Sequence, residues 1–204
     1  MIPLNLLVAF PYFSKQIFEY LQRQDHTRYR LMVDSGAFTA HMSGEPISLD
    51  DYCRFLDTIK CLRPFNAVQL DVIGDHEASL KNFEIMRSRG YDVMPVFTRG
   101  APPEMLEHLF SLSDYVLIGG VAVGENRQGY MKWLMPKIQN RKVHLLGFTN
   151  LDFVKAIRPH SIDSSALTSG GRYGRLALYQ GLGKMVNLSR EEVQQRGIAA
   201  VYTL

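Results

Sequence analysis

Three aspartates in this sequence each follow a short apolar run that is typical of a buried strand. Asp34 ends RLMVD, Asp71 ends AVQLD and Asp163 ends SID. In an α/β barrel the carboxyl ends of the parallel strands face the active site, so the three carboxylates would share one mouth. Two carboxylates that flank a sugar can run a double displacement, in which one attacks the anomeric carbon and the other protonates the leaving group. A single aspartate in such a place more often caps a helix or forms a turn, whereas three at strand ends indicate a site.

A glycine-rich segment, GGVAVGE at 119–125, follows another expected strand. Because glycine lacks a Cβ, a flat ligand could approach this backbone and hydrogen-bond to it, although an ordinary glycine-rich βα turn fits the same pattern. Phosphate binding is the weaker option, since the sequence has neither a P-loop nor a dinucleotide fingerprint here. Phe38, four residues after Asp34, could either stack on a base or belong to the core.

Basic and aromatic side chains alternate just after Asp163, in GGRYGRLALYQGLGK. The segment holds three cations that could follow the phosphates of a nucleic acid: Arg172, Arg175 and Lys184. A solvated loop with scattered charges fits it nearly as well. The formal net charge of +3 permits a polyanionic partner without requiring one, because binding depends on where the charges cluster.

The histidines and cysteines show no spacing that suits a metal. The six histidines are dispersed, and His144 within KVHLLGF is expected to be a satisfied core residue. Cys53 and Cys61 lie eight residues apart inside a helical pattern, which supplies no zinc site and fits a reduced intracellular compartment. We therefore expect neither a metal nor a cofactor. The apolar opening MIPLNLLVAFPYF lacks a basic leader and is predicted to be a first buried strand, and no apolar run reaches the ~20 residues that cross a bilayer.

Short apolar runs alternate with amphipathic stretches along the whole chain. The predicted strands, buried on both faces, are LLVAF, RLMVDSG, AVQLDVIG, DVMPVF, YVLIGG, KVHLLGF and SIDSSAL. The clearest helix begins at Ser48, where Asp51 completes a capping-box-like start before an apolar stripe of Tyr52, Phe55, Leu56 and Ile59. Further helices are predicted at 14–24, 77–89, 103–111, 127–139 and 150–157.

About seven βα repeats imply a parallel sheet, and a closed barrel is favoured over an open sheet because no dinucleotide fingerprint follows the first strand. With 204 residues the chain is long enough for one core and short for two, so residues 1–204 are predicted to form a single domain. Near the end, RLALYQGLGKMVNL could hold a strand or a hairpin, SREEVQQRG a capped helix and AAVYTL a last strand.

Four segments carry a resemblance to a known family: VDSGAF at 33–38, VQLD at 68–71, IGGVAVGE at 118–125 and SIDSSALTSGGRYG at 161–174. In this order and spacing they resemble the tRNA-guanine transglycosylases and their relatives that insert 7-deazaguanines into DNA. The third segment is nearly identical to the family's glycine-alanine-glycine turn, and the first differs from the family pattern by one Gly to Ala change. The resemblance implies a compact TIM-type (β/α) barrel that exchanges a base on a nucleic acid.

The resemblance also implies a role for each matching residue. Asp163 matches the carboxylate that attacks the sugar, and Asp34 matches the acid/base aspartate, with Ser35 and Gly36 beside it in the substrate site. Arg172 falls near a family arginine. Exchange through a covalent sugar intermediate would follow, with ping-pong kinetics.

The base pocket follows from the same matches. Phe38 matches the aromatic residue that stacks on the base, and Asp71 matches the aspartate that accepts hydrogen bonds from the Watson–Crick edge of guanine. Backbone contacts and the pocket floor would come from Gly119, Gly120, Val121, Leu146 and Gly147. The family's base-binding glutamine has no counterpart, since Phe97 and Thr98 stand near that place.

The chain lacks the cysteine- and histidine-bound zinc subdomain of the tRNA enzymes, so the DNA-modifying branch, the deoxypurine-in-DNA protein A type, is the closer resemblance. The expected partners are DNA, opened or with its base flipped out, and a free base such as 7-cyano-7-deazaguanine, in a bacterial or phage-infected cytoplasm. Three alternatives stay open: the same exchange on tRNA, a non-catalytic base-binding barrel that supports a partner subunit, and base hydrolysis. A partner protein or a second copy of the chain could supply further DNA contacts.

Overall fold

The computed structural model describes residues 3–121, 125–148, 150–164, 175–179 and 185–195. These residues form a mixed α/β protein with two four-stranded parallel sheets and an antiparallel hairpin. Within these ranges, no helix is both long enough and apolar enough to span a membrane.

The first sheet contains the strands that carry Asp34 and precede Asp71. Its strands are β1 (Leu4–Ala9), β2 (Tyr29–Asp34), β3 (Phe65–Val68) and β4 (Val93–Met94), in that order and all parallel. The register places Ala9 opposite Asp34, so the turn after β1 lies beside Asp34. The core behind this sheet is formed by α3 and by outward-facing strand residues such as Leu31 and Val33.

The second sheet carries the glycine turn and Asp163. Its strands are β5 (Val96–Thr98), β6 (Tyr115–Gly119), β7 (Lys142–Leu145) and β8 (Ser161–Ile162), again parallel and in chain order. All five residues of β6 are buried, as the prediction of strands covered on both faces required.

The two sheets meet at Pro95, the one residue between β4 and β5. On either side of this junction, the N–H of Gln69 donates to the Met94 carbonyl and the N–H of Leu117 donates to the Pro95 carbonyl, at 3.0 and 2.9 Å. A proline cannot donate to a sheet ladder, which explains why the strand is divided at this position. Inward-facing side chains from both sheets pack together over the junction: Val68, Met94, Val96, Tyr115 and Leu117, with Met32 and Leu146 against them.

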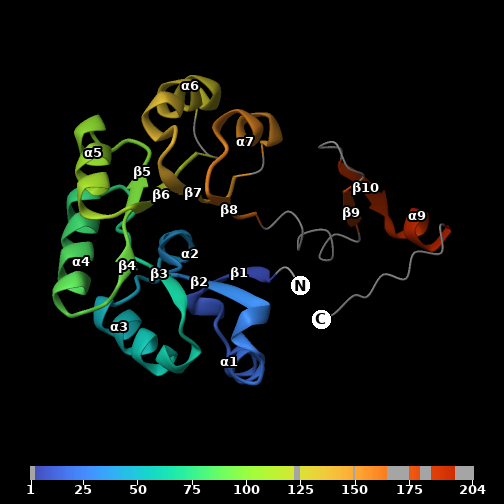
Figure 1. The fold of residues 1–204 in the computed structure, drawn as a ribbon, viewed down its shortest axis with the longest axis horizontal. Coiled ribbons are helices and arrows are strands. Elements are labelled where there is room, and N and C mark those ends of the chain that lie inside the picture. Colours follow the sequence, from blue (N-terminus) through green and yellow to red (C-terminus); the bar gives the residue numbers. More distant parts are fainter. Residues whose placement is uncertain (1–2, 122–124, 149, 165–174, 180–184, 196–204) are drawn as a thin grey trace.

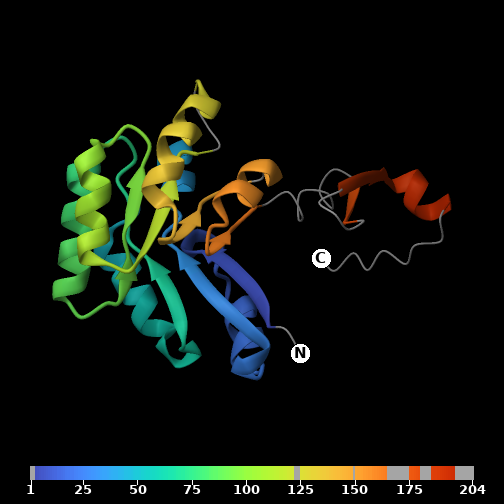
Figure 2. The same cartoon turned by 45° about the horizontal axis from the view of Figure 1, so that its top comes forward.

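Helices surround the strands as an arc that runs from α1 past α4 and α5 to α7 (Figure 1). Figure 2 shows α4 and α5 side by side on the outer face of the strands. The helices of this arc are α1 (Lys15–Gln22), α3 (Leu49–Thr58), α4 (His76–Ser88), α5 (Pro103–Leu112), α6 (Arg127–Ile138) and α7 (Leu151–Ile157). α2 (Ala37–Ser43) lies inside the arc in the view of Figure 1. Three short 3-10 helices accompany them: η1 (Phe10–Tyr12), η2 (His26–Arg28) and η3 (Lys60–Leu62).

The predicted helix at Ser48 is confirmed together with its physical basis. The Ser48 side chain accepts a hydrogen bond from the N–H of Asp51 and caps α3. Tyr52, Leu56 and Ile59 of the expected stripe are at most 3% exposed. The other five predicted helices also form, with ends shifted by at most two residues, as α1, α4, α5, α6 and α7.

The end of the chain is described in part. β9 (Arg175–Tyr179) and β10 (Met185–Ser189) pair antiparallel, which confirms the hairpin option for RLALYQGLGKMVNL. α9 (Arg190–Gln195) follows, and a reciprocal pair of hydrogen bonds between Ser189 and Glu192 forms the predicted cap. The strand predicted for AAVYTL lies outside the described residues.

The prediction that every strand is buried on both faces is wrong for β1 and β8. β1 is half-exposed, and its first residue, Leu4, is 63% exposed; both residues of β8 are half-buried. Among the described residues, each of these strands pairs with one neighbour, β2 and β7 respectively. No pairing between β8 and β1 occurs among the described residues, and closure of the barrel stays a prediction.

Candidate active site

The three aspartates lie at the carboxyl ends of parallel strands. Asp34 is the last residue of β2, Asp71 follows β3, and Asp163 follows β8. Burial raises the pKa of Asp34 above its ordinary value, and the negative charge of Asp163 raises it further. Burial also raises the pKa of Asp71 to about 7, with a smaller contribution from the charge of Asp34. Asp34 therefore lies within electrostatic reach of both other carboxylates, and we call this place the strand-end site, defined by Asp34, Asp71, Gly119 and Asp163.

Asp34 is held by a tight turn at the end of β2. Its Oδ2 accepts a hydrogen bond from the N–H of Gly36 at 3.2 Å, and Ser35 between them is 1% exposed. Gly36 has a φ of +77°, and a Cβ at this position would lie 2.3 Å from the Cδ of Pro11. Only glycine fits this turn without displacing Pro11, which explains the DSG sequence.

Phe38 lies on α2, two residues after this turn, and is 58% exposed. The option that Phe38 belongs to the core is therefore wrong. An exposed aromatic ring near the strand-end site is free of core packing and can serve as a stacking surface for a base.

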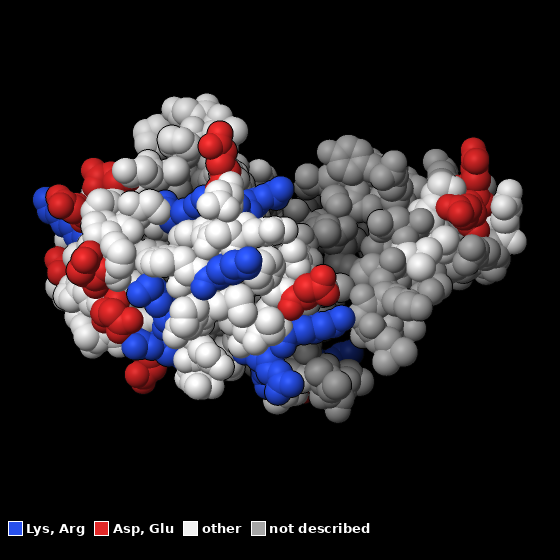
Figure 3. Space-filling model, turned by 90° about the horizontal axis from the view of Figure 1, so that it is seen from above, with Lys and Arg blue, Asp and Glu red and all other residues white. Residues whose placement is uncertain are grey.

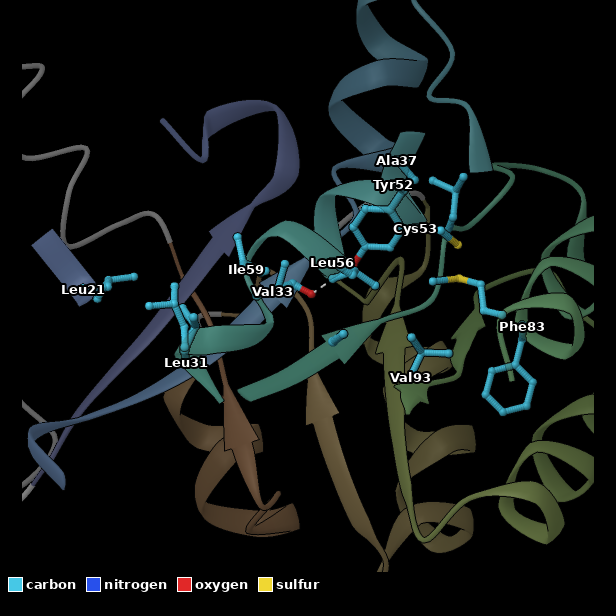
Figure 4. Packing of buried hydrophobic residues seen from close by; sticks show 14 of the residues in the cluster. Leu21, Leu31, Val33, Ala37, Tyr52, Cys53, Leu56, Ile59, Phe83 and Val93 are labelled. Carbon is cyan, nitrogen blue, oxygen red and sulfur yellow. Dashed lines mark hydrogen bonds between the residues drawn. The ribbon is translucent and has the colours of Figure 1, made fainter. Parts of the chain in front are cut away.

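A buried tyrosine on α3, Tyr52, joins the ends of β2 and β3. The Tyr52 hydroxyl lies 2.8 Å from the Val68 carbonyl and 3.4 Å from the Val33 carbonyl, and its ring is fully buried. Figure 4 shows the ring reaching from α3 toward Val33. Because Val33 directly precedes Asp34 and Val68 ends β3, this hydroxyl ties together the two backbones that present Asp34 and Asp71.

Asp71 has a neighbour that the sequence analysis missed. The Nε2 of Gln69 donates to Asp71 Oδ1 at 3.0 Å, and Gln69 is 1% exposed. Its Oε1 is buried and has no hydrogen-bond partner among the described residues. The i, i+2 spacing within VQLD is the signal that could have placed both side chains together.

The glycine turn begins at the buried carboxyl end of β6. A Cβ on Gly119 would make ordinary van der Waals contacts without a collision, the nearest being Val96 Cγ1 at 3.6 Å. Gly120 has a φ of +73°, and a Cβ there would lie 2.8 Å from the Cβ of Arg99. Val121 is 1% exposed and directs its side chain into the core. Residues 122–124 of this predicted segment lie outside the described residues.

Asp163 receives two hydrogen bonds on one of its two oxygens. The N–H of Gly147 donates to Oδ1 at 2.7 Å, and Nε2 of His144 lies 3.1 Å from the same atom. Oδ2 accepts no hydrogen bond from the described residues. This asymmetry leaves one carboxylate oxygen with free lone pairs for a reacting group.

His144 is buried, as predicted, but it is bonded to the candidate nucleophile rather than to a remote core group. It is 3% exposed, and its Nδ1 lies 2.6 Å from Ser161 Oγ. The sequence analysis missed this link because it depends on the pairing of β7 with β8, in which His144 lies opposite Ser161.

The two residues predicted to floor the pocket differ in role. Leu146 is half-buried and packs against the inward-facing apolar cluster, which agrees with a floor. Gly147 is exposed, has a φ of +62°, and acts on Asp163 through its N–H. Its place in a pocket floor stays a prediction.

One cation at the strand ends was also missed. Arg99 follows Thr98 at the end of β5, lies over the ring of Tyr130 at 4.8 Å and donates to the Glu125 carbonyl. Two cations of the predicted basic segment, Arg172 and Lys184, lie outside the described residues. The third, Arg175, is the first residue of β9.

A cavity of about 360 Å³ lies away from this site, near the amino ends of β3 and β4, and is lined by Arg63, Phe65 and Asp92 among others. Within the described ranges, no group of three or more histidine, cysteine, aspartate or glutamate side chains could hold a metal ion.

The strand-end site therefore brings together the groups that acid/base and nucleophilic chemistry with carboxylates requires. Asp34 is a buried carboxyl with a raised pKa, whereas Asp163 accepts hydrogen bonds from N–H donors. Two carboxyl groups with such different surroundings can serve as an acid and a nucleophile. Comparisons of the chain with protein-family models, curated proteins and solved structures found no match.

Proposed function

We propose that this chain is a transglycosylase that replaces guanine in DNA with a 7-deazaguanine, with Asp163 as the nucleophile and Asp34 as the acid and base. One observation carries the proposal: two carboxylates at one strand edge have different surroundings. Asp163 accepts two hydrogen bonds on Oδ1, whereas burial and the charge of Asp163 raise the pKa of Asp34. Surroundings that differ in this way assign the nucleophile and the acid of a retaining displacement.

In the first half-reaction, Oδ2 of Asp163 attacks C1′ of the deoxyribose. The bond between C1′ and N9 breaks, and its electron pair leaves with the guanine, which takes a proton from Asp34. The products are free guanine, an ester between Asp163 and the sugar, and an ionised Asp34.

In the second half-reaction, Asp34 removes the N9 proton of the incoming 7-deazaguanine. N9 then attacks C1′, the ester bond breaks, and its electron pair returns to Asp163. Both residues recover their starting states, so the cycle needs no external oxidant, reductant or cofactor, and free guanine must leave before the second base enters.

Base recognition would use Asp71, Phe38 and the backbone of Gly119–Val121. The Watson–Crick edge of guanine presents N1–H and N2–H donors, which an ionised Asp71 can accept. Guanine and 7-deazaguanine share this edge and differ on the five-membered ring. The same contacts can therefore hold the leaving and the entering base in turn.

The choice of DNA over tRNA rests on the resemblance and on the cysteines. The sequence has two cysteines, Cys53 on α3 and Cys61 in η3, and in this sequence DSGAF and IDSS followed by GRYG resemble the DNA-modifying branch more closely. Basic side chains lie across the middle of the face in Figure 3, and acidic ones lie at its left edge, at two places beside the basic ones and at the right end. The basic side chains in the middle support contact with phosphates. A duplex substrate must expose its base before attack, by flipping or by strand opening.

We also infer that the strands belong to a (β/α) barrel. The parallel strand order is continuous from β1 to β8 across Pro95, and β1 and β8 lie on the side that the arc of helices leaves open (Figure 1). Inward-facing residues of several strands pack in one cluster, as the interior of such a barrel requires. A cysteine pair that places one thiol on β1 and one on β8 would test closure, because it should cross-link under oxidation only if these edges are adjacent.

A base-transfer assay tests the activity. The protein is incubated with labelled 7-cyano-7-deazaguanine and, in separate reactions, with duplex DNA, single-stranded DNA or tRNA. We expect label in DNA. Label in tRNA alone would contradict the choice of polymer, and release of guanine without incorporation would indicate hydrolysis. No transfer and no release would exclude both reactions and favour a binding role.

A further inference from the structure

A chain of four side chains crosses the interior of the protein and ends on Asp163. The Tyr115 hydroxyl lies 2.6 Å from Ser161 Oγ, Ser161 Oγ lies 2.6 Å from His144 Nδ1, and His144 Nε2 lies 3.1 Å from Asp163 Oδ1. The residues come from β6, β7 and β8 and from the residue after β8. Tyr115 and His144 are 8% and 3% exposed, so bulk water does not compete for these bonds.

With Asp163 ionised and His144 neutral, the four groups allow one direction for each proton in this series of hydrogen bonds. An ionised Asp163 can only accept, so His144 must carry its proton on Nε2. In a neutral imidazole the other nitrogen then accepts, which requires Ser161 to donate to Nδ1. Ser161 Oγ in turn accepts from the Tyr115 hydroxyl, whose pKa burial raises, so that it keeps its proton. Each contact thus has one donor and one acceptor.

The same chain fixes the orientation of the Asp163 carboxylate. The N–H of Gly147 reaches Oδ1 from the backbone at 2.7 Å, and His144 reaches it from the interior. Rotation of the carboxylate about its last bond would break both hydrogen bonds at once. Oδ1 is therefore held, whereas Oδ2 accepts no hydrogen bond from the part of the chain that the structure describes.

We infer that His144 is a positioning residue for the transglycosylase, held in its Nε2–H tautomer by Ser161 and Tyr115 so that Asp163 presents Oδ2 to C1′. This inference rests on the proposed function, because it assigns Asp163 the role of nucleophile. His144 itself touches neither the base nor the sugar. It acts through the direction that it gives to Asp163, and the base-binding residues are not involved.

Kinetics of base transfer separate this role from a general structural one. His144→Phe keeps the ring volume and removes both nitrogens, so kcat should fall about 100-fold, the effect of a small misplacement of a reacting group, while KM for the free base stays within about twofold. His144→Gln restores an N–H near the Nε2 position and should recover about tenfold of the lost kcat. Ser161→Ala frees the tautomer and should lower kcat about tenfold. His160→Gln is the matched control, because His160 is exposed, packs edge-on against the Tyr115 ring with 5.2 Å between the ring centroids, and makes no hydrogen bond to the other described residues of this series; its kcat should equal that of the wild type.

A second measurement determines the tautomer of His144 and does not depend on base transfer. Nitrogen-15 NMR of the wild-type protein should show His144 neutral with the proton on Nε2, and Ser161→Ala should weaken this preference. A proton on Nδ1 alone, or a doubly protonated ring at pH 8, overturns the inference whatever the enzyme does. If the wild type transfers base and His144→Phe keeps its kcat, the inference fails while the proposed function stands. If the tautomer is as expected but the wild type transfers no base to any polymer, the proposed function fails and the positioning role fails with it.

Discussion

Asp71 lies close enough to Asp34 for the charge of Asp34 to raise its pKa, in addition to the larger effect of burial, to about 7. Gln69 opposes this shift by donating to Asp71 Oδ1 at 3.0 Å. The proposed base reader therefore changes its protonation state close to neutral pH, which makes both activity and stability depend on pH in directions that can be worked out.

The activity should decline in acid because Asp71 must be ionised to accept hydrogen bonds from the base. Below about pH 7 the folded protein carries a protonated Asp71, so kcat/KM for the free base should fall up to about tenfold per pH unit. The measurement is the pH profile of kcat/KM for 7-cyano-7-deazaguanine between pH 5 and 8.5. Asp71→Asn should have a low kcat/KM without this acidic decline. A flat wild-type profile down to pH 5 would exclude Asp71 as the reader.

The stability should respond to Asp71 in the opposite sense. The pKa of Asp71 is raised from an ordinary value near 3.8 to about 7 in the folded protein, so its ionisation disfavours folding. The stability that its neutral form contributes is fully present below pH 3.8 and is lost as the pH rises through 7. Asp71→Asn, which keeps an acceptor for Gln69, should raise the free energy of unfolding at pH 8 by about 2 to 4 kcal/mol and leave it unchanged near pH 3.5. Urea denaturation at both pH values checks this, and an equal effect at both would contradict it.

The hydroxyl of Tyr52 should contribute to both stability and activity. Tyr52→Phe leaves the buried Val68 carbonyl without its 2.8 Å hydrogen bond, which should lower the free energy of unfolding by about 1 to 2 kcal/mol. Because the same hydroxyl joins β2 to β3, kcat/KM should also decline, by roughly 3- to 10-fold.

Tyr91→Phe is the matched control for this change. It removes a hydroxyl that bonds to Asp57 Oδ2 at an exposed position, at 2.8 Å, and should change the stability by less than about 0.5 kcal/mol. An equal decrease in the free energy of unfolding in the two variants would mean that the buried Tyr52 hydroxyl contributes no more than an exposed one.

The two glycines that bound α2 offer a test of the turn at Asp34. Gly36 and Gly44 have similar positive φ angles, +77° and +74°, but a Cβ on Gly36 would meet Pro11 at 2.3 Å, whereas a Cβ on Gly44 would meet no atom within 4 Å. Gly44→Ala should lower the stability by about 1 kcal/mol through backbone strain alone. Gly36→Ala adds the collision, so it should lower the stability by about 2 to 4 kcal/mol and reduce activity by displacing Asp34. Thermal unfolding of both variants, beside base transfer, measures the difference. Similar values for both would show that Pro11 moves aside freely.

The sequence predicted the elements whose signals are local. α3 followed from the cap at Ser48 and from the spacing of Tyr52, Leu56 and Ile59, and all of these contacts form. α2 was missed because its seven residues follow a glycine cap, Gly36, and show no apolar stripe. The burial of β1 was overestimated because apolar composition does not reveal how much of a strand the rest of the protein covers.

In the candidate site, too, residues with a local sequence signal were predicted, and contacts that depend on strand pairing were not. Asp34, Asp71 and Asp163 could be selected because a strand end is visible in the sequence. The connection of His144 to Asp163 could not, since it depends on how β7 pairs with β8 and on which nitrogen meets which oxygen. The exposure of Phe38 likewise depends on how α2 leaves the sheet.

The most direct test of the central claim compares base transfer into DNA by the wild type and by Asp163→Asn. Asparagine keeps the size of the side chain and an oxygen that can accept from Gly147 and His144, so thermal unfolding should change little. It lacks the carboxylate that forms the ester, so transfer of labelled 7-cyano-7-deazaguanine should fall at least about a thousandfold. A variant that transfers base at the wild-type rate would contradict the account, as would a wild-type protein that places no label in DNA.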